Sequence, residues 1–235
     1  MQTLSLRSFC GRSSPAPQTA IHARPATDFE HSLAQASLCR VEAKEYLFVE
    51  GDPVSHLYRI ETGAIALYRA LADGRRQVMG FAYPGDLVGL GVEGEHVMNA
   101  QAVKPTRLRC LPLATLRHSA ARDPMLGFKL YEALARELAA TRDLMLTTGQ
   151  RSAVERLASF LLALSRRNGQ DPTVVELPMT RTDIGDFLGL TIETVSRTFT
   201  KLKMMGLLEL PQCNQVKILN VEELKGLADG EEHNT

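Results

Sequence analysis

The sequence has no excess charge of either sign, because 27 Lys and Arg residues balance 27 Asp and Glu residues. A balanced chain has no general attraction to a polyanion, so any contact with nucleic acid must come from a local patch. The chain lacks the run of about 18 apolar residues that a membrane helix needs, and its N-terminus lacks the apolar core of a secretory signal. With 235 residues, 44% of them hydrophobic, it is expected to be a cytoplasmic protein of two modest domains without a membrane partner.

Cysteine is scarce and scattered. The four cysteines are Cys10, Cys39, Cys110 and Cys213, and no two of them have the C-x-x-C spacing of a zinc pair or the close spacing of an iron-sulfur run. We therefore predict no metal and no cofactor. Disulfides seldom persist in the cytoplasm, so the four side chains are expected to be reduced thiols.

The first part of the chain has no acidic residue before Asp28 and is rich in Ser, Pro and Arg. This composition favours a flexible N-terminal arm over residues 1–28. An organelle transit peptide has the same bias and stays open as an alternative.

Short β-branched and aromatic runs fill residues 40–115, separated by glycines at intervals of 12, 11 and 11 residues. These glycines are Gly51, Gly63, Gly74 and Gly85. The interval fits one strand plus one turn of an all-β sandwich or barrel, and neighbouring Asp residues are typical of tight turns. The pattern predicts a β-roll or barrel domain over residues 29–120.

A helix pattern without Gly or Pro follows Asp123-Pro124, and we assign residues 121–150 to it. One set of its residues follows at alternating intervals of 3 and 4, which is the spacing of the contact seam in a two-stranded coiled coil. The seam consists of Tyr131, Leu134, Leu138, Thr141, Met145 and Thr148. Pairing with a second copy of the chain is the predicted role, and packing on its own domain is the alternative. Leu130 and Leu144 mark a second apolar edge that could serve the alternative.

The last third of the chain has the order helix, strand, helix, helix, hairpin, which is that of a winged helix-turn-helix domain, placed at residues 151–221. Thr182 is expected to cap the first of the two adjacent helices, Gly189 to make the turn, and Thr191 to cap the second. The fold class is therefore α+β, and residues 222–235 are set apart as an acidic tail.

The second helix presents a mixed polar edge. The 3.6-residue period directs Glu193, Ser196 and Arg197 outward, and in a major groove an Arg can donate to guanine while a Glu accepts from cytosine. Predicted phosphate-positioning residues are Thr182, Thr191, Thr194, Thr198 and Lys201. Two other interpretations stay open: an i,i+4 salt bridge on a solvated face, and plain helix packing.

The segment LPMTRTDIGDFLGLTIETVSRTFTKLKMMGLLEL resembles the helix-turn-helix of the cyclic-AMP receptor and fumarate-nitrate-reductase regulator (CRP/FNR) superfamily, most closely its FixK-type branch. LFVEGDPVSHLYRIETGAIALYR and GRRQVMGFAYPGDLVGL resemble its cupin-like, cyclic-nucleotide-binding β-roll. The resemblance implies a homodimeric transcription activator that recruits RNA polymerase in low-oxygen or nitrogen-fixation control. It also implies that Glu193, Ser196 and Arg197 read double-stranded DNA of the type TTGA-N6-TCAA.

The sensor half departs from two branches of that superfamily. No Arg occurs between Arg76 and Arg107, and Glu93, Glu95 and a neutral His would repel a cyclic phosphate, so no cyclic nucleotide is expected. The clustered cysteines of the oxygen-sensing branch are also missing. Cys213, in the predicted wing, is a possible redox site whose oxidation would weaken DNA binding, and an inert thiol is the alternative.

Two rival functions differ from this one in the residues that they require. A cupin-type metal enzyme needs clustered His and carboxylate ligands, whereas the β half offers only His56 and His96, far apart in the chain. A protein-interaction module would use the helical hairpin to bind another protein. We predict a DNA-binding regulator and no enzyme.

Overall fold

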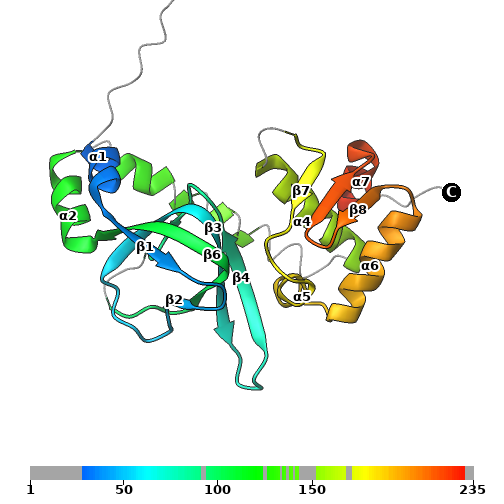
Figure 1. Ribbon diagram of the computed structural model, residues 1–235, viewed down its shortest axis with the longest axis horizontal. Helices are drawn as coiled ribbons and strands as arrows, with labels where there is room; N and C mark the ends of the chain where they lie inside the picture. The colour runs from blue at the N-terminus through cyan, green and yellow to red at the C-terminus, as the bar shows by residue number, and fades with distance from the viewer. Residues whose placement is uncertain are drawn as a thin grey trace, which may run out of the picture.

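The computed structural model describes residues 28–90, 94–123, 126–132, 134–135, 138–139, 141–142, 152–167 and 171–230. A β-sheet domain and a smaller helical domain lie side by side, joined by helices between them (Figure 1). The predicted α+β class is confirmed. The predicted N-terminal arm lies outside the described residues up to residue 27.

One six-stranded antiparallel sheet forms the first domain. Its path runs β1-β6-β3-β4, with β2 also paired to β6 and β5 paired to β3. The strands are β1 (Ser37–Val41), β2 (Tyr46–Phe48), β3 (His56–Ala70), β4 (Arg76–Ala82), β5 (Leu87–Val88) and β6 (Asn99–Pro112). Helices α1 (Asp28–Gln35) and α2 (Leu113–Arg122) lie together at one end of this domain (Figure 1). Buried Phe48, Ile60 and Ile65 lie in the core of the roll.

The turn predicted at Gly63 is wrong, although Gly51, Gly74 and Gly85 do lie in turns with positive φ. β3 continues through Gly63, and its pairing with β6 shifts register there. Gly63 has a φ of 101°, and a Cβ at this position would lie 2.3 Å from Thr106 Oγ1. Gly63 therefore allows a β-bulge in β3, packed closely against β6. The spacing of glycines along a sequence cannot distinguish such a bulge from a turn.

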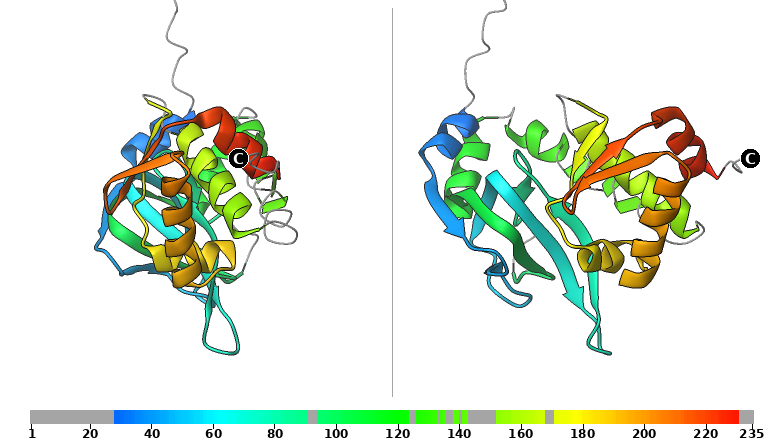
Figure 2. Two further views of the ribbon diagram at one scale, coloured as in Figure 1. Left: turned by 90° about the vertical axis from the view of Figure 1, so that its right-hand side faces the viewer. Right: turned by 45° about the vertical axis from the view of Figure 1, so that its right-hand side comes forward.

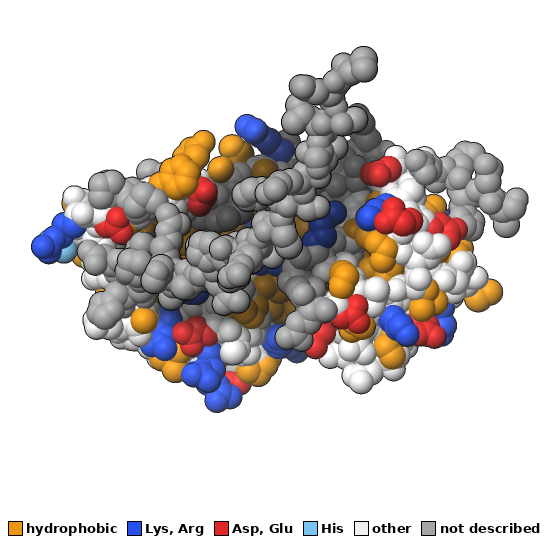
Figure 3. Space-filling model, turned by 90° about the horizontal axis from the view of Figure 1, so that it is seen from above, with side chains coloured by type: hydrophobic (Ala, Val, Ile, Leu, Met, Phe, Trp, Pro, Cys, Tyr) orange, Lys and Arg blue, Asp and Glu red, His pale blue; other side chains and the backbone are white. Residues whose placement is uncertain are grey.

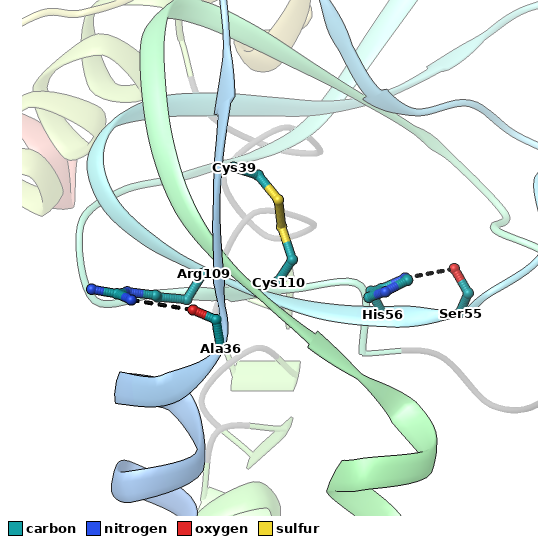
Figure 4. The surroundings of a disulfide bond; sticks show 6 residues. All are labelled: Ala36, Cys39, Ser55, His56, Arg109 and Cys110. Carbon is teal, nitrogen blue, oxygen red and sulfur yellow. Dashed lines mark hydrogen bonds between the residues drawn. A yellow bond between two sulfur atoms is a disulfide. The ribbon is translucent and has the colours of Figure 1, made fainter.

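Cys39 and Cys110 form a disulfide, which corrects the prediction that both are reduced thiols. β1 pairs with β6 so that Cys39 lies opposite Leu108 and Ser37 opposite Cys110, which makes the two cysteines diagonal neighbours. Their Cα atoms are 6.5 Å apart. Figure 4 shows the bond beside Arg109, whose Nη1 donates to the backbone oxygen of Ala36 at 3.1 Å. Only the pairing of strands far apart in sequence brings these thiols together.

The helix that follows α2, here called the connecting helix, comprises the described helical residues between 126 and 142. Leu126 is buried with Leu33 and Leu116, and Leu130 packs against this cluster. The described residues of the predicted pairing seam are exposed: Tyr131, Leu134, Leu138 and Thr141. Met145, Thr148 and Leu144 lie outside the described residues. Among the described residues, Leu130 therefore packs inward while the residues of the predicted seam face outward.

The second domain contains three helices, a three-stranded antiparallel sheet and a terminal helix. They are α4 (Ala153–Arg167), β7 (Val174–Glu176), α5 (Arg181–Leu188), α6 (Ile192–Met204), β8 (Leu208–Gln212), β9 (Gln215–Ile218) and α7 (Val221–Asp229). The sheet has the order β7-β9-β8. The hairpin of β8 and β9 is the predicted wing.

Helix α7 corrects the prediction of an acidic tail from residue 222. Asn220 caps it by accepting a hydrogen bond from the Glu223 amide. Leu224 and Leu227 are buried in the core of the second domain, since they lie three residues apart on one face of the helix. The opposite face of α7 carries acidic residues. A count of charges along this segment therefore suggests a polar tail, although the helix has an apolar face.

No helix among the described residues is long and apolar enough to cross a bilayer. On the described part of the face in Figure 3, basic and acidic side chains are interspersed. This agrees with the balanced composition and leaves any attraction to an anionic partner to local geometry.

Candidate nucleic-acid interface

Helices α5 and α6 meet at a tight turn that fixes the angle between them. Gly189 ends α5 in the left-handed conformation with a φ of 64°. A Cβ on Gly185 would lie 2.7 Å from the Leu190 backbone oxygen, so only glycine allows this close approach. The Leu190 amide donates to the Gly185 oxygen at 2.9 Å. Arg156 Nη1, from α4, donates to the Leu188 oxygen at 2.9 Å and holds the end of α5.

The two helices begin at capping threonines, one of which differs from the prediction. Thr180, and not Thr182, caps α5: its hydroxyl accepts from the Asp183 amide, and the Asp183 carboxylate accepts from the Thr180 amide at 2.9 Å. This is the reciprocal capping box, visible in the sequence as T-x-x-D. Thr182 lies exposed in the first turn instead. Thr191 caps α6 as predicted, accepting from the Thr194 amide at 3.2 Å.

The predicted base-reading residues lie together on the exposed edge of α6. Glu193, Ser196 and Arg197 are all exposed, and the opposite face of the helix is buried through Val195, Phe199 and Leu202. Lys201 is exposed one turn after Arg197. Figure 2 shows α6 on the outer side of the second domain. The edge is thus free to approach a surface outside the protein.

Glu193 is arranged to remain ionised. Its pKa is lowered because its carboxylate accepts a hydrogen bond from its own backbone N–H and one from Thr191, with the charge of Arg197 adding to the effect. An ionised carboxylate is an acceptor only. The edge therefore presents an acceptor at Glu193, a donor at Arg197, and at Ser196 a hydroxyl that can be either.

Thr198 does not belong to this edge, which corrects its prediction as a phosphate contact. It is 6% exposed, and its hydroxyl donates to the Thr194 backbone oxygen at 2.7 Å. Thr198 lies three residues after Val195 and four before Leu202, so the helical period places it on the inner face. A hydroxyl can occupy such a site because the preceding turn offers it an acceptor.

Arg181 is a residue that the sequence pattern did not single out. Its guanidinium lies 3.3 Å above the centre of the Phe199 ring, so it joins the start of α5 to the middle of α6. Nη1 is buried and has no hydrogen-bond partner among the described residues. Burial lowers the pKa of Arg181 to about 10, and the nearby Cys213 opposes this change. The guanidinium therefore stays charged at neutral pH.

The wing places Cys213 at its exposed turn, where it is a free thiol. β8 and β9 pair from Leu208 opposite Ile218 to Gln212 opposite Gln215. The electrostatic interaction between Cys213 and Arg181 shows that the wing turn lies near the start of α5. The wing and the two helices thus border one common region.

The β-roll brings no metal ligands together among the described residues, which contain no group of three His, Cys, Asp or Glu side chains suited to a metal ion. His96 is buried, and its ring stacks on Phe48 with centroids 3.5 Å apart. Burial lowers the pKa of His96, and Asp52 opposes this effect. His56 instead lies with Nδ1 2.9 Å from the Ser55 hydroxyl. The two histidines of the rival metal site therefore have separate surroundings.

Comparison with protein families agrees with this architecture in both halves. Residues 38–123 match the cyclic nucleotide-binding domain model, and residues 155–227 match the Crp-like helix-turn-helix domain model. Fold and site together define a transcription regulator that binds DNA through a helix-turn-helix and carries a β-roll of the cyclic-nucleotide-binding type.

Comparison with individual proteins identifies the branch of this class to which the chain belongs. The chain is 38% identical over 201 residues to the nitrogen fixation regulation protein FixK of Bradyrhizobium diazoefficiens, covering 84% of this chain and 83% of that protein. It is 37% identical over 205 residues to the transcriptional activatory protein AadR of Rhodopseudomonas palustris, covering 86% and 85%. The solved structure of FixK2 from Bradyrhizobium japonicum matches with a TM-score of 0.79 at 36% identity, covering 85% of this chain and 99% of that one. The chain belongs to the CRP/FNR family, in its FixK-type branch, and it is a regulator and not an enzyme.

Proposed function

We propose that this chain is a homodimeric activator that reads an inverted repeat of the type TTGA-N6-TCAA through Glu193, Ser196 and Arg197. The observation that carries the proposal is the exposed edge of α6, which presents an acid, a hydroxyl and a guanidinium while the opposite face is fixed in the core. A helix held in this way can enter a major groove without rearranging.

The three side chains have complementary roles. Arg197 offers two parallel donors, which suit the O6 and N7 acceptors of guanine. Glu193 accepts from the amino group of cytosine, for which the lowered pKa of its carboxylate is favourable. Ser196 can donate to or accept from the base between them. Thr182, Thr191, Thr194 and Lys201 are proposed to hold phosphates at the edge of the groove.

Pairing of two chains is proposed to place two α6 helices about one turn of DNA apart. The exposed side chains of Tyr131, Leu134 and Leu138 on the connecting helix support this, because they form an apolar stripe with the spacing of a coiled-coil seam. The proposed division of the chain is a sensor-like β-roll, a pairing helix and a winged DNA-binding domain.

The biological setting is inferred from the relatives. Their names describe a nitrogen fixation regulator and a transcriptional activator, so control of low-oxygen or nitrogen-fixation genes in the cytoplasm through recruitment of RNA polymerase is the proposed role. No cyclic nucleotide is proposed as effector, since the chain has no Arg between Arg76 and Arg107 to neutralise its phosphate.

Gel-shift titration of the full chain against TTGA-N6-TCAA DNA tests the proposal, with a scrambled duplex as control. We expect saturable binding of two chains per duplex and a preference over scrambled DNA of at least about a thousandfold. Footprinting across a genome would then give the operator and its position relative to promoters. Equal affinity for the two duplexes would rule out sequence reading.

Oxidation of Cys213 is proposed to weaken DNA binding. Its thiol is exposed in the wing turn near Arg181, so added negative charge there would face DNA phosphates. Peroxide should weaken operator binding by the unchanged protein and leave Cys213→Ser unaffected. Equal weakening of both proteins would mean that this thiol is inert.

A further inference from the structure

The β-roll and the helix-turn-helix touch through the start of β4 and the first helix of the pair, α5. Arg76 Nη2 donates to Asp183 Oδ1 at 3.3 Å, and Arg76 Nε lies 3.8 Å from Asp186 Oδ2. Beside it, Gln77 Nε2 donates to the backbone oxygen of Asp186 at 2.9 Å. In Figures 1 and 2, α5 lies between β4 and α6. A strand of one domain thus contacts the helix that supports α6.

An aromatic contact forms the second part of this junction. The ring of Phe81, on β4, lies 5.5 Å from that of Phe187 on α5 and 6.5 Å from that of Phe160 on α4. The Phe160 and Phe187 centroids are 5.5 Å apart. One contact would let α5 rotate about it, whereas an ionic and an aromatic contact at different points of β4 fix its direction.

The Arg76 side chain is also positioned by contacts within the β-roll. Its guanidinium lies 4.2 Å from the centre of the Tyr68 ring, and the Tyr68 hydroxyl is 2.7 Å from that of Tyr46. The Arg76 side chain is 32% exposed and the Asp186 side chain 26%. Burial raises the pKa of Asp186, an effect that Arg76 opposes and Asp183 reinforces. Removing the guanidinium would leave two half-buried carboxylates facing each other.

Helices α5 and α6 are joined at two points. The two helices share the close Gly185–Leu190 turn and the Arg181–Phe199 stack, and Asp183 both contacts Arg76 and closes the cap of α5. The orientation of the base-reading edge therefore follows the orientation of α5 against β4.

We propose that Arg76 is a positioning residue for DNA reading: through Asp183 and Asp186 it sets the orientation of α6 and so the half-site spacing that the dimer accepts. This inference rests on the proposed function, because spacing has meaning only for a dimer on an inverted repeat. The contact determines the distance between half-sites and leaves the bases read within each half-site unchanged.

The test compares operators with spacers of five, six and seven base pairs between TTGA and TCAA. Each added base pair moves a half-site along and around the duplex, so a rigid dimer should prefer one spacer. Arg76→Glu is expected to weaken binding to the preferred operator and to reduce the preference among spacers about fivefold or more. Its preference for TTGA over an altered half-site should not change.

Three further variants separate positioning from loss of folding. Arg76→Lys should keep most of the spacing preference, and Arg76→Glu combined with Asp186→Arg should restore it. Arg75→Glu is the matched control, because Arg75 is adjacent, 77% exposed at its side chain and paired with Asp73. Its spacing profile should equal that of the unchanged protein.

An unchanged spacing profile in Arg76→Glu overturns this inference, as does a double variant that folds and does not recover the preference. Thermal melting of each variant identifies loss of folding. Failure of the unchanged protein to bind any of the operators would instead overturn the proposed function, so the two failures are distinguishable.

Discussion

Arg197 and Lys201 lie one turn apart on the exposed edge of α6 and are expected to contribute differently to DNA binding. Arg197→Ala removes a two-pronged donor to a base, so it should cost about 1–3 kcal/mol on the operator and relax base preference at one position. Lys201→Ala removes a point charge near phosphate and should weaken all sequences alike. Titrations on operator and random DNA at several salt concentrations measure both effects.

The dependence of DNA affinity on salt concentration further distinguishes the role of Arg197 from that of Lys201. Lys201→Ala should reduce the magnitude of the slope by about one ion and leave the ratio of specific to random binding unchanged. An equal loss on operator and random DNA for Arg197→Ala would show that this residue does not read a base.

His96 should make stability depend on pH. Burial against Phe48 lowers its pKa below the ordinary 6.5, so the unfolded chain binds the proton more readily than the folded one. Its contribution is complete above about pH 6.5 and is lost as pH falls through the lower folded pKa. Thermal melts from pH 7.5 to 5 should show a fall in stability that His96→Gln reduces. Parallel curves for the two proteins would contradict this assignment.

At the scale of single elements, two glycines on helices should respond oppositely to the same substitution. Gly185→Ala forces a Cβ within 2.7 Å of the Leu190 oxygen and should destabilise the protein by about 1–3 kcal/mol. Gly127→Ala meets no atom within 4 Å and should stabilise the connecting helix by up to about 1 kcal/mol. Urea unfolding of both variants measures the difference. Equal effects would mean that the α5–α6 turn can open without cost.

The disulfide between β1 and β6 should stabilise the first domain. It closes a loop of 71 residues, for which loop-closure entropy gives a contribution of about 4 kcal/mol. Cys39→Ser should lower the free energy of unfolding under oxidising conditions by a few kcal/mol and have little effect in excess reductant. The unchanged protein with reductant is the control. A variant as stable as the oxidised wild-type chain would show that the bond does not form in solution.

For the whole molecule, the exposed stripe on the connecting helix predicts the oligomeric state. Leu134 and Leu138 are about half exposed, and a charge at either would be buried in the proposed seam, so Leu134→Glu and Leu138→Glu should favour the monomer. Ala139→Glu is the control, because it places the same charge on an exposed neighbour outside the seam. Analytical sedimentation measures the oligomeric state of each variant. Affinity for the operator should fall in the variants that become monomeric. A dimer unaffected by both Leu variants would place the interface elsewhere.

Local patterns in the sequence were sufficient for the features that depend on neighbours along the chain. The outward positions of Glu193, Ser196 and Arg197, the Gly189 turn and the wing hairpin follow from helix period and turn chemistry, which act over a few residues. The Thr180 capping box and the inner position of Thr198 were also present in the pattern. Spacing along the helix decides both features, and residue type alone does not.

By itself, the sequence determined a β-roll, a helix with an exposed stripe of coiled-coil spacing and a helix-turn-helix with an exposed polar edge, because each of these features is encoded in periodicity. Only the tertiary structure decided that Cys39 meets Cys110, that Gly63 lies in a bulge against Thr106, and that Arg76 contacts α5. These contacts join residues between 40 and more than 100 positions apart. Strand pairing and domain packing create them, and no short window of sequence contains both partners.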